Sequence, residues 1–221
     1  IFSRGIRRRG GVILPTKLQF YADLANEQTR QVTGSRENGT GFLTSAGRLY
    51  KYPFEEQLMI YAQRPNATAC APLETWNKPM NRYVRRGSKG IALIDQSGDI
   101  PRLRYVFDYA DTIDGRQNAR KPYVWEMKPE HEDAVIEAID NAYNIDSFMG
   151  WEGIGGRALV GSEVGDIIFG LAHELAARYY EDNERDIGYS AENSFLEDYD
   201  EFNLKIAYQD ALTVSAAYCM M

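Results

Sequence analysis

The sequence contains few of the residues from which metal sites and disulfide frameworks are built. It has two cysteines and two histidines among 221 residues, and Cys70 and Cys219 are too far apart in sequence to form a Cys-x-x-Cys pair. This spacing excludes a zinc knuckle and gives no sign of a disulfide framework. We expect both cysteines to be small buried apolar residues, and we expect the protein to need no cofactor.

The sequence also lacks any long apolar run. No segment approaches the roughly 18 uninterrupted apolar residues that can cross a bilayer. The first residues, Ile1-Phe2-Ser3-Arg4, lack the apolar centre of a signal peptide. We therefore expect a cytoplasmic protein with no membrane partner. Because the chain starts without Met and residues 216–221 are apolar, we expect a segment of a longer polypeptide whose other domains are candidate partners.

Acidic residues outnumber basic ones, but the two kinds are unevenly distributed. The formal net charge is −7. Residues 1–105 contain 17 Lys and Arg against 8 Asp and Glu, whereas residues 106–221 contain 8 against 24. This asymmetry predicts a basic face that meets a polyanion and an acidic face that does not. The alternative is that two solvated surfaces of opposite charge attract each other within one molecule.

The patterning predicts an α+β fold in which a small antiparallel sheet packs with N-terminal helices and is followed by a mostly helical C-terminal half. The predicted elements of the first half are helices over 15–34 and 53–63, a loop over 35–47, a short strand over 67–71, a helical turn over 73–78, a hairpin at about 90–109 and a loop over 111–121. In the second half we expect helices starting at Pro129, Val160 and Glu201. The glycine-rich segment 150–156 predicts a flexible joint, and the acidic segment 181–200 a mobile connection.

These elements suggest three parts of different character. Residues 1–14, with four arginines between Arg4 and Arg9, predict a flexible basic arm. Residues 15–114 predict an α+β module that binds nucleic acid, with its centre at about Tyr52 to Thr112. Residues 115–221 predict an acidic helical region packed on this module and continuing in a longer chain.

Residues 76–90 hold five cations and two large aromatic residues within 15 positions. Binding of single-stranded nucleic acid requires cations for the phosphates and flat rings on which bases stack. Two glycines in this segment favour a tight turn that exposes backbone N–H groups. The candidate binding residues are Arg64, Trp76, Lys78, Arg82, Tyr83, Arg85, Arg86, Ser88 and Lys89. The alternative is a cationic loop whose two rings belong to the core.

Part of this region resembles the N-terminal ArdC-like domain of antirestriction and conjugative-element proteins. The resemblance runs through Pro53-Phe54-Glu55-Glu56-Gln57-Leu58-Met59-Ile60-Tyr61-Ala62-Gln63-Arg64-Pro65, Trp76, Val84-Arg85-Arg86-Gly87-Ser88-Lys89-Gly90-Ile91, Val106-Phe107-Asp108 and Thr112. It covers about a quarter of the chain. It implies single-stranded DNA binding, as one module of a mobile-element protein. Because contacts to phosphates carry no base information, we expect this binding to be independent of sequence.

One motif resembles a zinc metallopeptidase signature, which some ArdC-like proteins carry in a second domain. His173-Glu174 begins a His-Glu-x-x-His pattern, but position 177 is Ala. Zinc hydrolysis on a helix needs two imidazoles four residues apart. We therefore expect no enzyme activity and no metal site, with a degenerate metallopeptidase-like domain as one alternative. The other alternative is that the acidic helical half imitates DNA and occupies the nucleic-acid channel of a defence enzyme.

Overall fold

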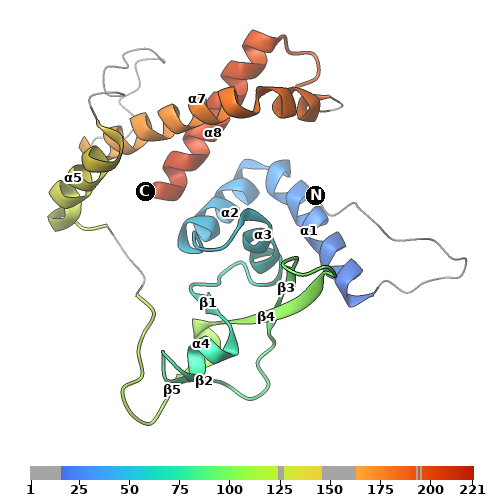
Figure 1. The fold of residues 1–221 in the computed structure, drawn as a ribbon, viewed down its shortest axis with the longest axis vertical. Coiled ribbons are helices and arrows are strands. Elements are labelled where there is room, and N and C mark those ends of the chain that lie inside the picture. The colour runs from blue at the N-terminus through green and yellow to red at the C-terminus, as the bar shows by residue number, and fades with distance from the viewer. Residues whose placement is uncertain (1–15, 124–126, 146–162, 193, 195) are drawn as a thin grey trace, which may run out of the picture. The chain divides into compact units, whose positions relative to one another are not determined.

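The computed structural model describes residues 16–123, 127–145, 163–192, 194 and 196–221. The chain divides into two compact units, Ile1–Trp125 (unit 1) and Glu126–Met221 (unit 2). Unit 1 combines helices with two small antiparallel sheets, and unit 2 is helical (Figure 1). The predicted α+β fold is confirmed. The predicted basic arm at 1–14 and the glycine-rich joint at 150–156 lie outside the described residues.

Unit 1 begins with three helices and continues into short strands. Its elements are α1 Lys17–Gly34, α2 Arg36–Arg48, α3 Phe54–Gln63, β1 Cys70–Ala71, α4 Leu73–Asn77, β2 Arg82–Val84, β3 Ile91–Asp95, β4 Arg102–Asp108, a 3-10 turn Tyr109–Asp111 and β5 Thr112–Asp114. The predicted helices around α1 and α3 are confirmed, as is the hairpin of β3 and β4. The predicted loop over 35–47 is wrong, because Ser35 caps α2 by accepting a hydrogen bond from the backbone N–H of Asn38.

The larger sheet of unit 1 has the strand order β1-β4-β3 and lies against α1 and α3. Four of the five β3 residues are buried, and three of them, Ile91, Leu93 and Ile94, share a core cluster with residues of α1 and α3. The α1 and α3 members include Ala22, Ala25, Met59 and Ile60. The free edge of β3 is closed by the side-chain amide of Gln63. This amide accepts from the N–H of Ala92 and donates to its carbonyl oxygen. The side chain of Gln63 therefore provides hydrogen bonds to this edge of β3 in place of a neighbouring strand.

The second sheet is a two-stranded ribbon of β2 and β5, which Figure 1 shows beside α4 at the end of unit 1 away from α1. In this ribbon Arg82 faces Asp114, Tyr83 faces Ile113 and Val84 faces Thr112. The predicted loop over 111–121 is therefore wrong in its first part. A three-residue strand has too few alternating positions to be recognised from sequence.

Unit 2 contains a 3-10 turn Pro129–His131 and the helices α5 Glu132–Tyr143, α7 Glu163–Ala191 and α8 Glu201–Met220. Val164, Ile168 and Ala172 of α7 form a core with Ala217 of α8, and apolar side chains of α5 pack against it. The predicted helix starts near Pro129 and Glu201 are confirmed, whereas the predicted mobile connection over 181–200 is wrong because α7 continues to Ala191. None of the helices within the described residues is long and apolar enough to span a bilayer.

Candidate nucleic-acid interface

The segment 85–90 connects β2 to β3 and forms the predicted turn. The backbone N–H of Ser88 donates to the carbonyl oxygen of Arg85 (3.1 Å), and Gly87 has a φ of +89°, a conformation that favours glycine. The N–H of Arg85 donates to the carbonyl oxygen of Asp111 (2.9 Å), which extends the ribbon by one residue. At the far end of the turn, a Cβ on Gly90 would lie 3.2 Å from the side chains of Phe107 and Tyr105. The turn is thus attached at both ends.

The cations of this turn face solvent. Arg85, Arg86 and Lys89 are exposed and Ser88 is half-buried. Lys78, which lies just after α4, is also exposed. Within the part of the chain that the structure describes, no carboxylate forms an ion pair with any of these four cations. Their charges are therefore available to an anion from solution.

Two of the predicted nucleic-acid-binding arginines, Arg82 and Arg64, form ion pairs within unit 1. The Arg82 side chain is 5% exposed, pairs with Asp114 at 2.5 Å and donates from Nε to the hydroxyl of Thr112 at 2.8 Å. Its guanidinium lies over the Tyr109 ring, 4.4 Å from the centroid. Arg64 pairs with the carboxylate of Asp111. The prediction that Arg82 contacts a phosphate is wrong, because its buried guanidinium already has an acidic partner. That Arg64 binds nucleic acid stays a prediction, since its side chain is 29% exposed beside Asp111.

The two aromatic candidates have opposite environments. Trp76 is 2% exposed, and its indole N–H donates to the carbonyl oxygen of Phe107 at 2.9 Å. The prediction that Trp76 stacks on a base is therefore wrong, since a base cannot reach a ring in the core. Tyr83 is 48% exposed and lies directly opposite Ile113, which is also 48% exposed. These two side chains form an apolar surface on one face of the ribbon.

A second basic segment, which the sequence reasoning missed, is attached to the other end of the ribbon. Arg116, Arg120 and Lys121 are exposed. The N–H of Gly115 donates to the carbonyl oxygen of Asn81 (2.9 Å), and the N–H of Arg120 donates to that of Met80 (2.8 Å). The sequence signal for this segment is that three cations follow the β-compatible residues Thr112 and Ile113. Their attachment to the ribbon depends on the pairing of β5 with β2.

Gly115 shows how closely this second segment approaches residue 81. A Cβ at Gly115 would lie 2.5 Å from the backbone oxygen of Asn81, so only glycine fits there without a shift of the chain. Asn81 itself has a φ of 48°, and its side-chain amide donates to the carbonyl oxygen of Gln117. The segment 115–120 is therefore held against residues 80–81 by several contacts.

The exposed cations consequently form two groups at the two ends of the ribbon. Lys78, Arg116, Arg120 and Lys121 belong to the end where Arg82 pairs with Asp114, and Arg85, Arg86 and Lys89 follow the opposite end. We refer to these seven cations, with Tyr83 and Ile113 between them, as the basic ribbon surface. The three-residue strands separate the two groups by about 10 Å.

The incomplete zinc motif lies in unit 2. His173 of α7 is half-buried, and burial lowers its pKa, which Glu174 and Asp210 partly counteract. Within the described ranges, no group of three or more His, Cys, Asp or Glu side chains is placed to hold a metal ion.

Burial raises the pKa of Cys70 to about 12, and this half-buried thiol is free. Cys70 and Cys219, which the sequence predicted to be buried apolar residues, are both half-buried.

Comparison with known proteins identifies no relative, since no family model, curated protein or solved structure matches this chain.

Proposed function

We propose that unit 1 binds single-stranded DNA along the basic ribbon surface, without sequence preference and without catalysing a reaction. The observation that carries this proposal is the arrangement of exposed cations, which form no ion pair with any described residue, at both ends of a ribbon whose middle exposes Tyr83 and Ile113. Cations at both ends suit successive phosphates, and an exposed ring between them suits the face of an unpaired base. Duplex DNA offers no base face to this ring.

The resemblance to ArdC-like domains supports the same proposal, because the implied activity is single-stranded DNA binding. On the same resemblance, we propose that this chain is part of a cytoplasmic mobile-element protein. Arg85, Arg86 and Lys89 belong to the resembling segment and are exposed, whereas Arg116, Arg120 and Lys121 lie outside it. Contacts to phosphates carry no base information, so we expect weak sequence preference from this surface.

The test is a salt titration of the full chain with a fluorescent single-stranded oligonucleotide. If three to five phosphates are neutralised, log K falls with log salt at a slope of roughly −2 to −3.5, at about −0.7 per contact. The double substitution Arg85→Ala/Lys89→Ala should make the slope shallower by about 1.4. Lys17→Ala/Arg30→Ala removes the same charge from exposed positions of α1 and should leave the slope unchanged. A wild-type slope near zero rejects the proposal.

A second proposal concerns unit 2, which contains 21 acidic residues against 5 basic ones. Glu181, Asp182, Glu184 and Asp186 are exposed on the part of α7 that extends beyond the predicted helix. Carboxylates fixed on a rigid helix can present a regular negative surface to a DNA-binding protein. This feature favours the DNA-mimic alternative over a merely solvated connection.

A further inference from the structure

The basic turn 85–90 lies between two exposed tyrosines, of which the proposed function uses only one. Tyr83 of β2 comes two residues before the turn and is 48% exposed. Tyr105 of β4 lies beside Gly90, at the other end of the turn, and is 45% exposed. The cations of the turn, including the exposed Lys89, therefore lie between two rings that solvent can reach.

The direction of the Tyr105 side chain follows from its two neighbours in β4. Arg104 pairs with Glu56 of α3 at 2.6 Å. Val106 is buried in the core cluster that includes residues of α1 and α3. Successive side chains of a strand point to opposite faces of the sheet. Tyr105 therefore points to the face of the sheet away from Glu56.

Two small residues of β3 leave room for the Tyr105 ring next to the turn. Ala92 is directly opposite Tyr105 in the register of the hairpin. A Cβ at Gly90 would lie 3.2 Å from Cβ of Tyr105 and 3.3 Å from its Cδ1, so the tyrosine side chain lies directly against bare backbone there. Lys89 precedes this glycine and is exposed. A nucleotide whose base stacks on Tyr105 consequently has its phosphate beside the turn.

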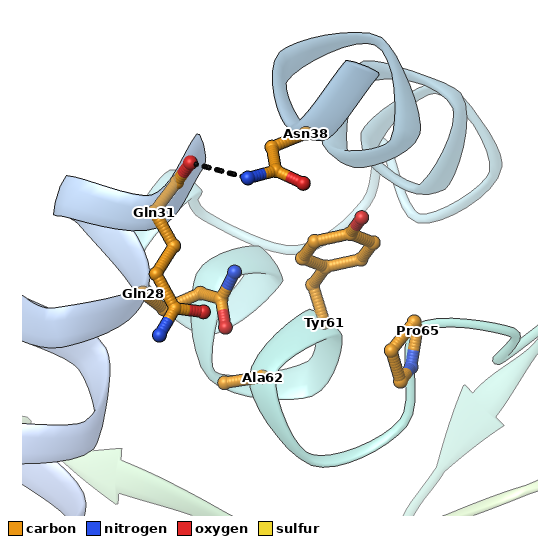
Figure 2. Close-up of a pocket in the computed structure, with 6 residues that line it drawn as sticks. All are labelled: Gln28, Gln31, Asn38, Tyr61, Ala62 and Pro65. Carbon is orange, nitrogen blue, oxygen red and sulfur yellow. Dashed lines mark hydrogen bonds between the residues drawn. The ribbon is translucent and has the colours of Figure 1, made fainter. Parts of the chain in front are cut away.

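A surface hollow between α1, α2 and α3 is a competing place for the strand to continue. It has a volume of about 310 Å³. Figure 2 shows the residues that line it, which are Gln28, Gln31, Asn38, Tyr61, Ala62 and Pro65. None of these side chains is charged, and none belongs to the basic ribbon surface. The hollow offers a phosphate no counter-charge, whereas Tyr105 adjoins a turn of cations, so the hairpin is the better continuation.

We propose that Tyr105 is a second base-stacking ring of the DNA site, so that the bound strand crosses the turn from Tyr83 to Tyr105 with its phosphates on the cations between them. The inference rests on the proposed single-stranded DNA binding and extends that site onto the β3–β4 hairpin. Every base has a flat face, so the second ring adds affinity without adding sequence preference. Duplex DNA gains nothing from it, because its bases are already stacked on each other.

The test compares the full chain and its variants in salt titrations with a fluorescent single-stranded oligonucleotide of mixed sequence. Tyr105→Leu keeps apolar bulk against Gly90 but has no flat ring, and it should weaken binding about fivefold or more. Its salt slope should equal that of the wild type, because stacking neutralises no phosphate. Tyr105→Phe keeps the ring and should bind as the wild type does. Thermal unfolding shows whether both variants are folded.

Photochemical crosslinking locates the ring without a variant. An oligonucleotide that contains iodouracil in place of thymine is irradiated in complex with the wild-type chain, and the attached peptides are identified. We expect crosslinks at both Tyr83 and Tyr105. Absence of a crosslink at Tyr105 overturns the inference, whether or not Tyr105→Leu folds. Gln28→Ala alters the hollow and should change neither the affinity nor this crosslink.

The outcomes separate this inference from the function on which it rests. If Tyr105→Leu binds as the wild type does while Tyr83→Ala weakens binding, the hairpin is outside the site and the ribbon surface stands. If Gln28→Ala is then the weaker binder, the strand continues into the hollow instead. If Tyr105→Phe binds as weakly as Tyr105→Leu, the hydroxyl and not the ring makes the contact, and the inference is overturned. If the wild type binds no oligonucleotide, the proposed function fails, and this inference fails with it.

Discussion

Trp76 and Tyr83 lie seven positions apart, yet one is a core residue and the other a surface residue. Trp76 is buried beside β4, and its indole N–H donates to the carbonyl oxygen of Phe107. Tyr83 points away from the same body because its neighbours in β2, Arg82 and Val84, point inward. Alternation along a three-residue strand thus decides which ring a ligand can reach.

This difference predicts opposite effects of two substitutions. Trp76→Phe removes the indole N–H and leaves the oxygen of Phe107 without its donor, so we expect a loss of about 1–3 kcal/mol in the free energy of unfolding and unchanged DNA affinity. Tyr83→Ala should change stability by less than about 0.5 kcal/mol but weaken single-stranded DNA binding by about 1–3 kcal/mol. Urea denaturation and fluorescence anisotropy measure the two effects. Reduced DNA affinity in folded Trp76→Phe would contradict this assignment.

The arginines could not be sorted in the same way from the sequence. Arg82 and Arg85 belong to the same basic segment, but Arg82 forms an ion pair with Asp114, which lies about 30 residues further along, and Arg85 is exposed. The sequence predicted a loop at residue 114 and gave no reason to pair this acid with β2. The basic turn itself was predictable, because its glycines and cations are contiguous in sequence. The contribution of Arg116 and Arg120 was not, because it depends on the same long-range pairing.

His173 predicts a pH-dependent stability of unit 2. Burial lowers the pKa of this imidazole from its ordinary value of 6.5, so the folded state favours the neutral form. The stabilisation is complete above that value and is lost as the pH falls toward the lowered pKa. Glu174 on the same helix and Asp210 on α8 favour the charged form and moderate the effect.

The corresponding measurement is thermal unfolding of the full chain between pH 7.5 and about 5. We expect His173→Gln to reduce the loss of stability over this range, because glutamine does not titrate. His131→Gln, which removes the other histidine, is measured alongside for comparison. An identical pH dependence in His173→Gln and the wild type would show that burial of this imidazole does not control it.

At the scale of elements, α2 is the clearest failure of sequence reasoning. Its glycines and its Asn38 are poor helix formers, and this composition indicated a loop. Packing overrides the propensity, since Phe42 and Ala46 are buried and the Phe42 ring meets the rings of Phe54 and Tyr61. The helices α1, α3 and α8 were predictable because their signals are local in the sequence. These signals are the residues that start or cap each helix and, for α1 and α3, an apolar stripe. The extra length of α7 was missed because the surface of its last turns is acidic.

The contact between Gly41 and Tyr61 gives a prediction about α2. Alanine in place of a helical glycine usually adds about 0.5–1 kcal/mol of stability. At position 41 a Cβ would lie 2.6 Å from the Tyr61 hydroxyl but 3.8 Å from Cζ. We therefore expect Gly41→Ala to destabilise the wild type and to stabilise the Tyr61→Phe variant, in which the hydroxyl is absent.

Urea denaturation of the four proteins in this cycle measures the coupling. Gly39→Ala provides a comparison on the same helix, because its Cβ would meet the backbone oxygen of Val32 at 3.2 Å, which Tyr61→Phe cannot relieve. Equal effects of Gly41→Ala in the two backgrounds would mean that the tyrosine moves aside without cost.

At the scale of the whole molecule, the charge asymmetry of the sequence follows the division into units. Unit 1 contains 20 Lys and Arg against 11 Asp and Glu, and unit 2 contains 5 against 21. The sequence placed the end of the basic module at residue 114, but the backbone bonds of Gly115 and Arg120 attach this segment to residues 80–81. The cations of 116–121 therefore belong with unit 1, and 21 of the 32 acidic residues lie in unit 2.

This separation allows the two proposed activities to be tested in one chain, with each set of substitutions serving as the control for the other. The two proposals predict inhibition of a restriction endonuclease by different routes: the cations of unit 1 would cover phosphates of its DNA substrate, whereas unit 2 would occupy its DNA-binding channel. Replacing Glu181, Asp182, Glu184 and Asp186 by their amides removes exposed negative charge from α7. If unit 2 acts as the DNA mimic, this variant should inhibit about tenfold less strongly at low salt, whereas Arg85→Ala/Lys89→Ala should inhibit as the wild type does. The reverse result, with inhibition lost only in the arginine and lysine variant, would assign the effect to DNA binding by unit 1 and reject the mimic, because a competitor for the enzyme's channel does not need cations of its own.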